Sequence, residues 1–553
     1  MKKNCLNLFS VLIVLMLVVC IFVSCGEKEN SNHEHVWNEG TYETEPTCTE
    51  KGSLIYSCSE CDETKTEEVE ALGHTEVIDS AVASTCTQSG LSEGKHCSVC
   101  NEVLVAQTYT AKLPHNLVND VCTVCFYEVY TNGLIFELND GENDYSVVGY
   151  EGTLPDVIIP ATYNQKPVVA ISNEAFKGNT VISTIKIPSS ITEIGASAFY
   201  ECENLEEIEI PNTVNIIKDF TFYKCENLET VTFLGNIRGF GESAFEYCES
   251  LGSITIPESC ETISDRAFSC CYSLSSINLP NGLTYLGGGA FRYCQSLTSV
   301  TVPSSINTIH SQTFFYCITL KNVTISEGVR KIESYAFQTC KQLQALNIPA
   351  SVNCIEAYCI AYADLIQSIT VDANNTTYDS RSNCNAVIET ETNTLIVGCS
   401  KTSIPSGITA IAEAAFFYCT GISNVYIPDT VETIGKSAFS GCESLGHMVI
   451  PESVTRIEDG TFANCKYLRT VDIKGDVTYI GSGAFKAALY LEKIILPASI
   501  TFIGENAFTN ASPNAIIYYR GTYTQWSEIN NQDSITLYNY QNNGKMIFAY
   551  TGD

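Results

Sequence analysis

The chain has 553 residues, 45% of them hydrophobic, which is enough for several domains and a large buried core. It carries 63 acidic against 30 basic residues, for a formal net charge of −33. Such a surface repels phosphate backbones and excludes nucleic acid from the expected partners. Because the acidic residues are spread along the whole chain, we interpret them as a well-solvated exterior.

The first residues have the pattern of an export signal. Lys2 and Lys3 precede a continuous apolar run over residues 8–23, which ends at small residues. The alternative is a retained membrane helix, because the run is nearly long enough to span a bilayer.

The end of the apolar run favours cleavage over retention. Residues 22–25 read Phe-Val-Ser-Cys and resemble the lipobox of bacterial lipoproteins, with Phe22 in place of the usual leucine. In that family the cysteine is lipidated and becomes the mature N-terminus, and its acyl chains give stable anchoring. The resemblance therefore implies a signal peptide over residues 1–24 and lipidation of Cys25. A tether over residues 25–34 would follow, at the extracellular face of the membrane, with membrane contact through the lipid alone.

Residues 35–127 are rich in cysteine and histidine and contain an internal duplication. Equivalent cysteines, such as Cys58 and Cys97, recur at a nearly constant interval in two full copies, and a shortened third copy follows. Two cysteines separated by two residues reach one Zn²⁺ ion from a tight turn. A third cysteine and a histidine from neighbouring segments would close a tetrahedral shell, as in structural zinc sites. The residues predicted to bind metal are Cys48, Cys58, Cys61, His74, Cys86, Cys97, Cys100, His115, Cys122 and Cys125.

Disulfides are the competing interpretation of these cysteines, because an exported protein meets oxidising conditions. The odd number of cysteines in each full copy favours metal, and free thiols are a third alternative. Similar short Cys/His repeats occur in surface proteins of anaerobic Gram-positive bacteria, a resemblance that implies no known activity.

From about residue 130 one repeat dominates the chain. Its phenylalanine anchor recurs every 23 residues from Phe176 to Phe337, and again from Phe416 to Phe508. An apolar pattern held this strictly predicts a solenoid. In each unit, L-x-x-I-x-I-P predicts a short strand with one buried face that ends at proline. The V-x-x-I-G segment predicts a turn with a second short strand, and A-F-x-x-C predicts a tight helical turn.

The repeat also fixes the expected domain limits. We expect an N-terminal cap over residues 128–175, the solenoid over 176–520 and a C-terminal cap over 521–553. An irregular insertion at about residues 361–410 has the pattern of an added hairpin, which is a binding loop or a tolerated excursion.

The repeat signature carries a family resemblance. The pattern I-P-x-x-V-x-x-I-G-x-x-A-F-x-x-C-x-x-L resembles the BspA-like, or Treponema-type, leucine-rich repeats of bacterial cell-surface proteins, over nearly all of residues 130–520. The resemblance implies a curved repeat solenoid and, for some members, adhesion to host proteins or other cells. The family shares no set of binding residues, so none is carried over.

A row of cysteines follows the anchors at a fixed distance of three residues. We predict reduced, buried thiols rather than a metal ladder or a chain of disulfides, because free cysteine packs as a small hydrophobe and Ala488 takes the same place in a later unit. Side chains of stacked coils also point in parallel, which keeps their Cβ atoms too far apart for good disulfide geometry. The row comprises Cys202, Cys225, Cys248, Cys271, Cys294, Cys317, Cys340, Cys419, Cys442 and Cys465.

The sequence contains no H-E-x-x-H motif and no paired catalytic histidine in the repeats, so we expect a binding protein and not an enzyme. Two outward stripes of the solenoid are the candidate binding surfaces. One lies between the buried strand residues and includes Glu209, Tyr426, Val449 and Ile495, and the other lies just before the cysteines that follow the anchors. Tyrosines there would bury a large contact area with little loss of conformational entropy. The tyrosines singled out are Tyr247, Tyr293, Tyr316, Tyr418 and Tyr426.

The expected function is that of a cell-surface adhesin or ligand-binding scaffold, with proteins or glycans of host or neighbouring cells as partners. A structural spacer of the cell envelope, or a carbohydrate-binding accessory protein, is the alternative. For each single tyrosine, packing between coils is the competing explanation.

Overall fold

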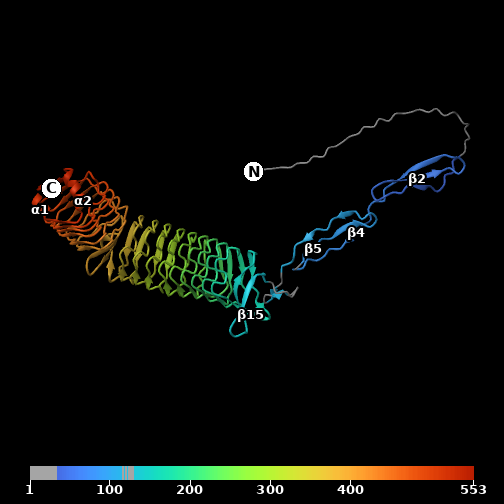
Figure 1. Cartoon of the computed structure of the whole chain (residues 1–553), viewed down its shortest axis with the longest axis horizontal. Coiled ribbons are helices and arrows are strands. Elements are labelled where there is room, and N and C mark those ends of the chain that lie inside the picture. The colour runs from blue at the N-terminus through green and yellow to red at the C-terminus, as the bar shows by residue number, and fades with distance from the viewer. Residues whose placement is uncertain (1–33, 87, 115–116, 119–120, 123–129, 553) are drawn as a thin grey trace, which may run out of the picture. The chain divides into compact units, whose positions relative to one another are not determined.

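The computed structural model describes residues 34–86, 88–114, 117–118, 121–122 and 130–552. The predicted signal peptide, Cys25 and nearly all of the tether lie outside these residues. Two compact units divide the chain between His115 and Asn116 (Figure 1). In the described part of the chain, no helix has both the length and the apolar character needed to cross a bilayer.

The N-terminal unit consists of small antiparallel sheets. The first Cys/His module, residues 35–69, is the sheet β1–β2–β3, and the second Cys/His module, residues 76–113, contains β4–β6–β7 and β5–β8. Their bounds are β1 Thr41–Thr44, β2 Gly52–Ser57, β3 Thr64–Val69, β4 Glu76–Asp79, β5 Gly90–Leu91, β6 Gly94–Cys97, β7 Val103–Val105 and β8 Tyr109–Thr110. A short pair follows, β9 Leu117–Val118 with β10 Val121–Cys122. Neither hydrophobic core of the described chain includes a residue of the two modules.

After the β9–β10 pair, which already belongs to the C-terminal unit, two further strand pairs precede the solenoid. Strands β11 (Leu134–Leu138) and β12 (Tyr145–Tyr150) are antiparallel, as are β14 (Thr162–Tyr163) and β15 (Lys166–Ile171). Strand β15 also pairs in parallel with the first short strand of the solenoid, so these pairs continue into the coil stack.

The predicted I-x-I-P strands form the first ladder of the solenoid, in which each strand aligns with its equivalent one repeat further on. Buried and more exposed side chains alternate along most of these strands, as in Glu207–Ile210, which confirms the prediction of a strand with one buried face. The first ladder comprises β13 Asp156–Ile158, β16 Thr184–Lys186, β18 Glu207–Ile210, β20 Thr230–Phe233, β24 Ser299–Val302, β26 Asn322–Ile325, β28 Ala345–Ile348, β30 Ser368–Val371, β36 His447–Ile450, β38 Thr470–Ile473, β40 Lys493–Leu496, β42 Ile516–Tyr519 and β44 Met546–Ile547.

The V-x-x-I-G segments form a second ladder of two-residue parallel strands, also as predicted. In each, the second residue turns inward and the first faces outward or is half-buried, except at β21 and β43. The second ladder comprises β17 Glu193–Ile194, β19 Ile216–Ile217, β21 Gly239–Phe240, β22 Thr262–Ile263, β23 Tyr285–Leu286, β25 Thr308–Ile309, β27 Lys331–Ile332, β29 Cys354–Ile355, β34 Ala410–Ile411, β35 Thr433–Ile434, β37 Arg456–Ile457, β39 Tyr479–Ile480, β41 Phe502–Ile503 and β43 Asn530–Asn531.

The A-F-x-x-C segments form consecutive turns, which confirms the predicted turn, although its backbone is not helical. Residues two before and two after the anchor have left-handed backbones, as Ser197 (φ 56°) and Glu201 (φ 57°) show around Phe199. Their amides donate to the next coil, to the carbonyls of Asp219 (2.9 Å) and Tyr223 (2.7 Å). Because the left-handed residues aim these N–H groups along the stack, this third side of each coil also joins its neighbours.

The anchor rings form a continuous stack inside the coils. Phe268 is fully buried, and its ring centroid lies 5.3 Å from that of Phe245 and 5.5 Å from that of Phe291, with interplanar angles of 4°. The same offset stacking runs from Phe176 to Phe337 and from Phe416 to Phe508. The constant repeat period thus places each anchor phenylalanine against the equivalent phenylalanine of the next coil.

The cysteines that follow the anchors are buried, except the half-buried Cys419, and all have free thiols. These cysteines also form hydrogen bonds that the sequence did not predict. In most coils the thiol donates to the backbone carbonyl of the anchor phenylalanine in the preceding coil. The Cys294 sulfur lies 3.3 Å from the Phe268 oxygen, and that of Cys202 lies 3.0 Å from the Phe176 oxygen. Burial raises the pKa of Cys202 to about 12, so the thiol stays protonated and can donate.

Replacing Cys294 with alanine is expected to lower the free energy of unfolding by about 1–2 kcal/mol, because the change removes a buried sulfur and a hydrogen bond. Urea denaturation of the purified protein measures the difference. Cys354→Ala is the matched control, since Cys354 is half-buried on β29, and it should be nearly neutral. Equal effects of the two variants would contradict the proposed role of the thiol.

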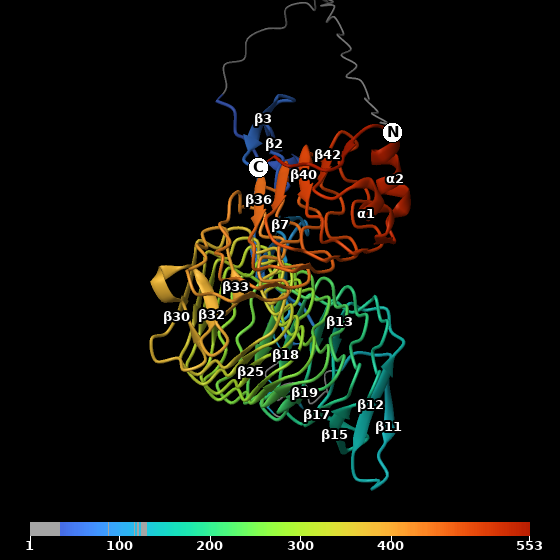
Figure 2. The ribbon, with the colours of Figure 1, turned by 90° about the vertical axis from the view of Figure 1, so that its left-hand side faces the viewer.

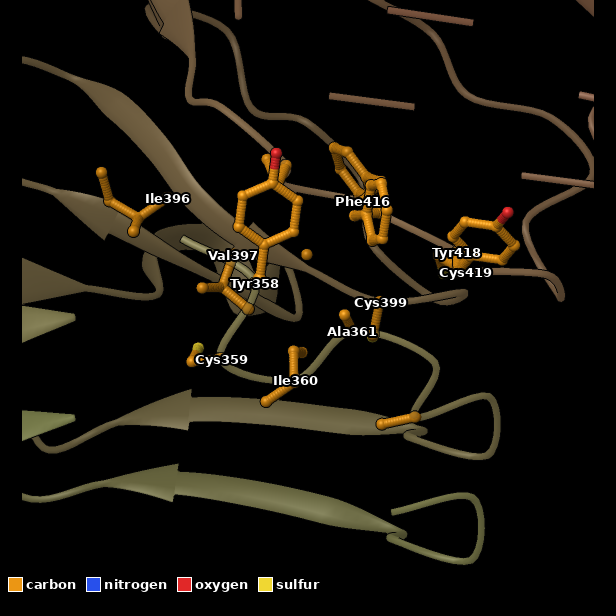
Figure 3. A pocket seen from close by; sticks show the side chains of 15 residues that line it. Tyr358, Cys359, Ile360, Ala361, Ile396, Val397, Cys399, Phe416, Tyr418 and Cys419 are labelled. Carbon is orange, nitrogen blue, oxygen red and sulfur yellow. The ribbon is translucent and has the colours of Figure 1, made fainter. Parts of the chain in front are cut away.

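An insertion interrupts the stack, and the core divides there into two hydrophobic clusters, each of which includes residues of the insertion. It contains β31 (Tyr378–Asp379), the 3₁₀ turn η1 (Arg381–Asn383), β32 (Ala386–Glu389) and β33 (Thr394–Gly398). Strand β32 pairs antiparallel with β31 and β33, and β33 then pairs in parallel with β34 of the second ladder. A cavity of about 20 Å³ lies at this junction, lined by residues 358–361, 363, 396–399 and 414–419 (Figure 3).

The C-terminal end of the stack carries two helices, α1 (Tyr523–Ser527) and α2 (Ser534–Asn542) (Figures 1 and 2). Thr522 caps α1 by accepting from the Gln525 amide, and the Gln525 side chain accepts in return from the Thr522 amide. Trp526 of α1 is buried and its ring contacts Tyr519 of the last long strand, so this helix covers the core.

One ion-pair group on the solenoid predicts a pH effect. Lys331 Nζ lies 2.7 Å from Glu356 and 3.2 Å from Glu333, and the hydrogen bond from Lys331 is the largest cause that lowers the pKa of Glu356 to about 2. A carboxylate with a lowered pKa stabilises the fold above its unfolded value, near 4.5, and loses this effect as the pH falls towards 2.

Glu356→Gln should therefore make stability less dependent on pH between about 4.5 and 2, as measured by thermal unfolding across that range. Glu432→Gln is the control, because Glu432 is exposed and forms no ion pair with the described residues. An unchanged acid dependence in Glu356→Gln would refute the assignment.

Candidate functional site

The Cys/His modules bring four predicted ligands into one cluster. Cys48, His74, Cys97 and Cys100 each offer a donor atom, and these atoms lie within 4.8 Å of one another. The Cys48 and Cys97 sulfurs are 3.6 Å apart, and the Cys100 sulfur is 3.4 Å from His74 Nδ1. We call this set the shared cluster, because Cys48 belongs to the first module and Cys97 and Cys100 to the second. The C-x-x-C pair of the second module is thus joined by a third cysteine from the first module and by a histidine from the connection between them.

A second group lies wholly within the first module. His35, Cys58 and Cys61 also have donor atoms within 4.8 Å of one another, and the Cys61 sulfur is 3.4 Å from His35 Nδ1. We call it the first-module cluster. Its three residues match three of the shared cluster at one constant offset along the sequence.

In both clusters a glutamate contacts the far side of the histidine ring. Glu102 Oε2 lies 3.4 Å from His74 Nε2, and Glu63 Oε2 lies 3.3 Å from His35 Nε2. Metal-binding histidines usually donate their other ring N–H to a carboxylate, which fixes the tautomer and turns the free nitrogen to the ion. The glutamates therefore leave Nδ1, which faces the cysteines, as the donor. Sequence reasoning missed them, although both stand two residues after the second cysteine of a C-x-x-C pair.

The spacing of the donors fits a metal shell better than a disulfide. With Zn–S bonds of about 2.3 Å and Zn–N bonds of about 2.0 Å, a tetrahedral shell places sulfurs about 3.8 Å apart and sulfur and nitrogen about 3.5 Å apart. The separations of 3.6 and 3.4 Å in the shared cluster are close to these edges. A disulfide needs about 2.05 Å between sulfurs.

The thiols of the shared cluster have different electrostatic environments. The backbone hydrogen bond from Cys100, with a further one from Val99, lowers the pKa of Cys97 to about 5, because the N–H dipoles stabilise the thiolate. Desolvation is the largest cause that raises the pKa of Cys48 to about 11, and the contacts of its thiol with Cys97 and Cys100 raise it further. One thiolate ready to bind a cation, beside a thiol that a cation would deprotonate, suits a soft divalent metal.

The other predicted ligands are placed differently. Cys86 is buried in the second module, and the Cys122 backbone lies in β10. His115 and Cys125 lie outside the described residues. Among the remaining histidines, His96 Nδ1 lies 2.8 Å from Asp79 and belongs to neither cluster.

Four of the five predicted binding tyrosines lie on the turn side of the coils. Tyr247, Tyr293, Tyr316 and Tyr418 have left-handed backbones, are half-buried and contact rings of adjacent coils. Tyr418, for example, stacks on Tyr362 with ring centroids 3.9 Å apart. Much of each ring is therefore used in packing between coils.

Tyr426 is placed differently. It stands at the repeat position of the exposed stripe of the first ladder, and 72% of its surface is accessible. Val449 holds the same position in the next coil and is 38% accessible. Ile495, expected on the same exposed stripe, is only 2% accessible, so that expectation was wrong. At the N-terminal end of this face, Asp156, Lys186 and Glu209 line a groove of about 450 Å³.

Two further tyrosines, not singled out from the sequence, form an exposed pair. Tyr467 and Tyr490 stand one period apart, with ring centroids 5.0 Å apart and an interplanar angle of 17°. They are 43% and 46% accessible, and exposed Leu489 lies next to Tyr490 in the chain. Their separation by a single repeat period was the signal that could have found them.

The solenoid matches a known repeat family. The six-copy sequence model of the BspA type leucine rich repeat region matches residues 154–274, 261–389 and 396–514, more than half of the chain. The chain belongs to the BspA-type leucine-rich-repeat family. The matched ranges do not include the Cys/His modules.

Two solved structures resemble this BspA-type chain. A leucine rich cell surface protein from Faecalibacterium prausnitzii is 28% identical over 73% of this chain and 98% of that protein, with a TM-score of 0.50. A leucine-rich repeat protein from Bacteroides ovatus is 26% identical over 71% of this chain and 100% of that protein, with a TM-score of 0.53. No curated protein matches the chain. BspA-type repeat proteins are scaffolds, and the family supports a binding role for the exposed faces.

Proposed function

We propose that this BspA-type protein is exported, held at the extracellular face of the membrane by a lipid on Cys25, and acts as an adhesin or ligand-binding scaffold. The observation that carries the proposal is the exposed stripe of the first ladder, which leaves one face of coil after coil open and includes Tyr426, 72% accessible. Proteins or glycans of host or neighbouring cells are the proposed partners. The cell-surface description of the Faecalibacterium relative supports the location.

A binding screen of the purified chain against matrix proteins, glycans and partner cells tests this function. Tyr426→Ala should weaken the binding it finds by about 5- to 30-fold, as for a central interface tyrosine. Tyr538→Ala is the matched control, because Tyr538 is 62% accessible but lies on α2. Absence of binding to any probe, or equal losses in both variants, would contradict a role of this face.

The anchor is tested separately in a bacterial host. Cys25→Ala should remove lipid labelling and release the protein from the membrane fraction, since two acyl chains are what make such anchoring stable. Unchanged membrane retention of the variant would instead support a retained apolar helix at residues 8–23.

The exposed Tyr467–Tyr490 pair favours carbohydrate binding as a second candidate function. Two nearly parallel rings offer an apolar platform, and Lys466 Nζ lies 5.2 Å from the Tyr467 ring centroid. Tyr490→Ala should abolish glycan binding while leaving protein partners bound. A glycan array that shows no difference between the variant and the wild type would remove this candidate.

We also propose that the Cys/His clusters hold structural Zn²⁺. The cysteine and histidine donors, their tetrahedral spacing and the glutamates behind the histidines support zinc over disulfides. Metal analysis of the purified protein tests it, and a protein without zinc would refute it.

A further inference from the structure

The four donors of the shared cluster come from three consecutive parts of the chain. Cys48 lies in the loop between β1 and β2 of the first module, and His74 lies on the connection between the modules. Cys97 and Cys100 form the turn between β6 and β7 of the second module. The cluster is therefore the point where the first module, the connection and the second module meet.

Other contacts between the modules are few. The Leu72 amide donates to Thr47 and the Ser98 amide to Thr75, which attaches the connection to each module in turn. Leu72 itself is 65% accessible, and neither hydrophobic core of the described chain includes the modules. Without an apolar interface, little besides the cluster opposes rotation of one module against the other.

Domains of this size without a core generally need a covalent or metal cross-link. The shared cluster supplies the donors for one, whereas the first-module cluster draws on the first module alone. Cys48 is the residue that makes the difference, because His35, Cys58 and Cys61 correspond one by one to His74, Cys97 and Cys100.

We infer that one Zn²⁺ ion, held jointly by Cys48, His74, Cys97 and Cys100, clamps the two Cys/His modules into one orientation. The inference rests on the proposed zinc binding and adds the ligand set and the role of the ion. His74 binds through Nδ1, and each thiol that is protonated before binding releases its proton to solvent. With three thiolates and one imidazole the shell is closed, which is the form of a structural site.

Zinc retention tests the ligand set. In the purified full-length chain, Cys48→Ala should weaken retention of one ion against a chelator by more than about 100-fold, because removing a ligand exceeds the 10- to 100-fold effect of a residue behind a ligand. Glu102→Gln should fall within that smaller range, which a merely structural glutamate would not produce. Cys58→Ala should instead destabilise only the ion of the first-module cluster.

The distance between the modules tests the clamp. Fluorescent non-natural amino acids at Tyr42 on β1 and Tyr109 on β8, both exposed, report it without using thiols. The wild-type chain with zinc should give a narrow distance distribution, which Cys48→Ala or a chelator broadens and Cys58→Ala leaves narrow. Circular dichroism of the solenoid, a separate compact unit, should not change in any variant and so confirms folding.

The outcomes separate the two proposals. Wild-type protein without zinc would refute zinc binding and the clamp together. Zinc in both clusters, with retention and distance unaffected by Cys48→Ala, would overturn the clamp and leave zinc binding intact.

Discussion

Replacing Phe268 with alanine is expected to lower the free energy of unfolding of the solenoid by about 3–5 kcal/mol. The ring is fully buried and stacks on Phe245 and Phe291 with centroids 5.3 and 5.5 Å away, so its removal breaks two stacking contacts and leaves a cavity. Coils contact only their neighbours, so the cavity cannot be filled from elsewhere in the stack. Urea denaturation followed by circular dichroism measures the loss.

Phe315→Ala provides the comparison for Phe268. Phe315 lies in the next coil but one and is half-buried on the turn side, where its ring contacts Tyr293. Its loss should destabilise the solenoid by much less. If both variants lost the same stability, the central stack would not be the main support of the coils.

Gly398→Ala is expected to destabilise the junction at the insertion by about 1–3 kcal/mol or more. A Cβ at this position would lie 2.2 Å from Cε1 of Phe416, the first anchor ring after the insertion. That ring is buried and stacks on Phe439 with centroids 4.9 Å apart, so it cannot move away without disturbing the second core cluster. Figure 3 shows Phe416 beside the cavity at this junction.

Gly252→Ala is the matched control, because a Cβ there would meet no atom within 4 Å and its backbone is not left-handed. It should be neutral or slightly stabilising. Because the core is divided at the insertion, Gly398→Ala should also separate the unfolding of the coils before and after it into two transitions. A single transition at wild-type stability would show that Phe416 relocates freely.

The repeat made most of the fold predictable. The constant spacing of the anchors from Phe176 onward and the alternation within I-x-I-P are direct consequences of a stacked core, so both ladders and the buried cysteines followed from the sequence. The turn side did not, because left-handed residues there include Glu201, Tyr293 and Thr339, which are not residue types that favour this backbone. Gly441 and Asn464 at the same place in later coils were the available signal.

The candidate metal site was predictable in its residue types but not in its grouping. The interval between the copies fits a shell within one copy as well as a shell between two. Only the fold shows that Cys48 faces Cys97 rather than Cys58, because the loop after β1 reaches the turn of the next module. The exposure of single side chains could not be predicted from the repeat either. Tyr426 and Ile495 occupy the same repeat position, but Tyr426 is 72% accessible and Ile495 is 2% accessible.

The parallel pairing of both ladders determines how the solenoid responds to force. Its strands run around the coils, so the hydrogen bonds between coils point along the stack. Tension between the two ends then breaks the hydrogen bonds between one pair of coils before those of the next pair. The bonds of all coils are not loaded together in shear. Each coil that opens releases one repeat of the sequence, roughly 80 Å of extended chain. The protein would therefore lengthen in equal steps under load and refold coil by coil when the load is removed.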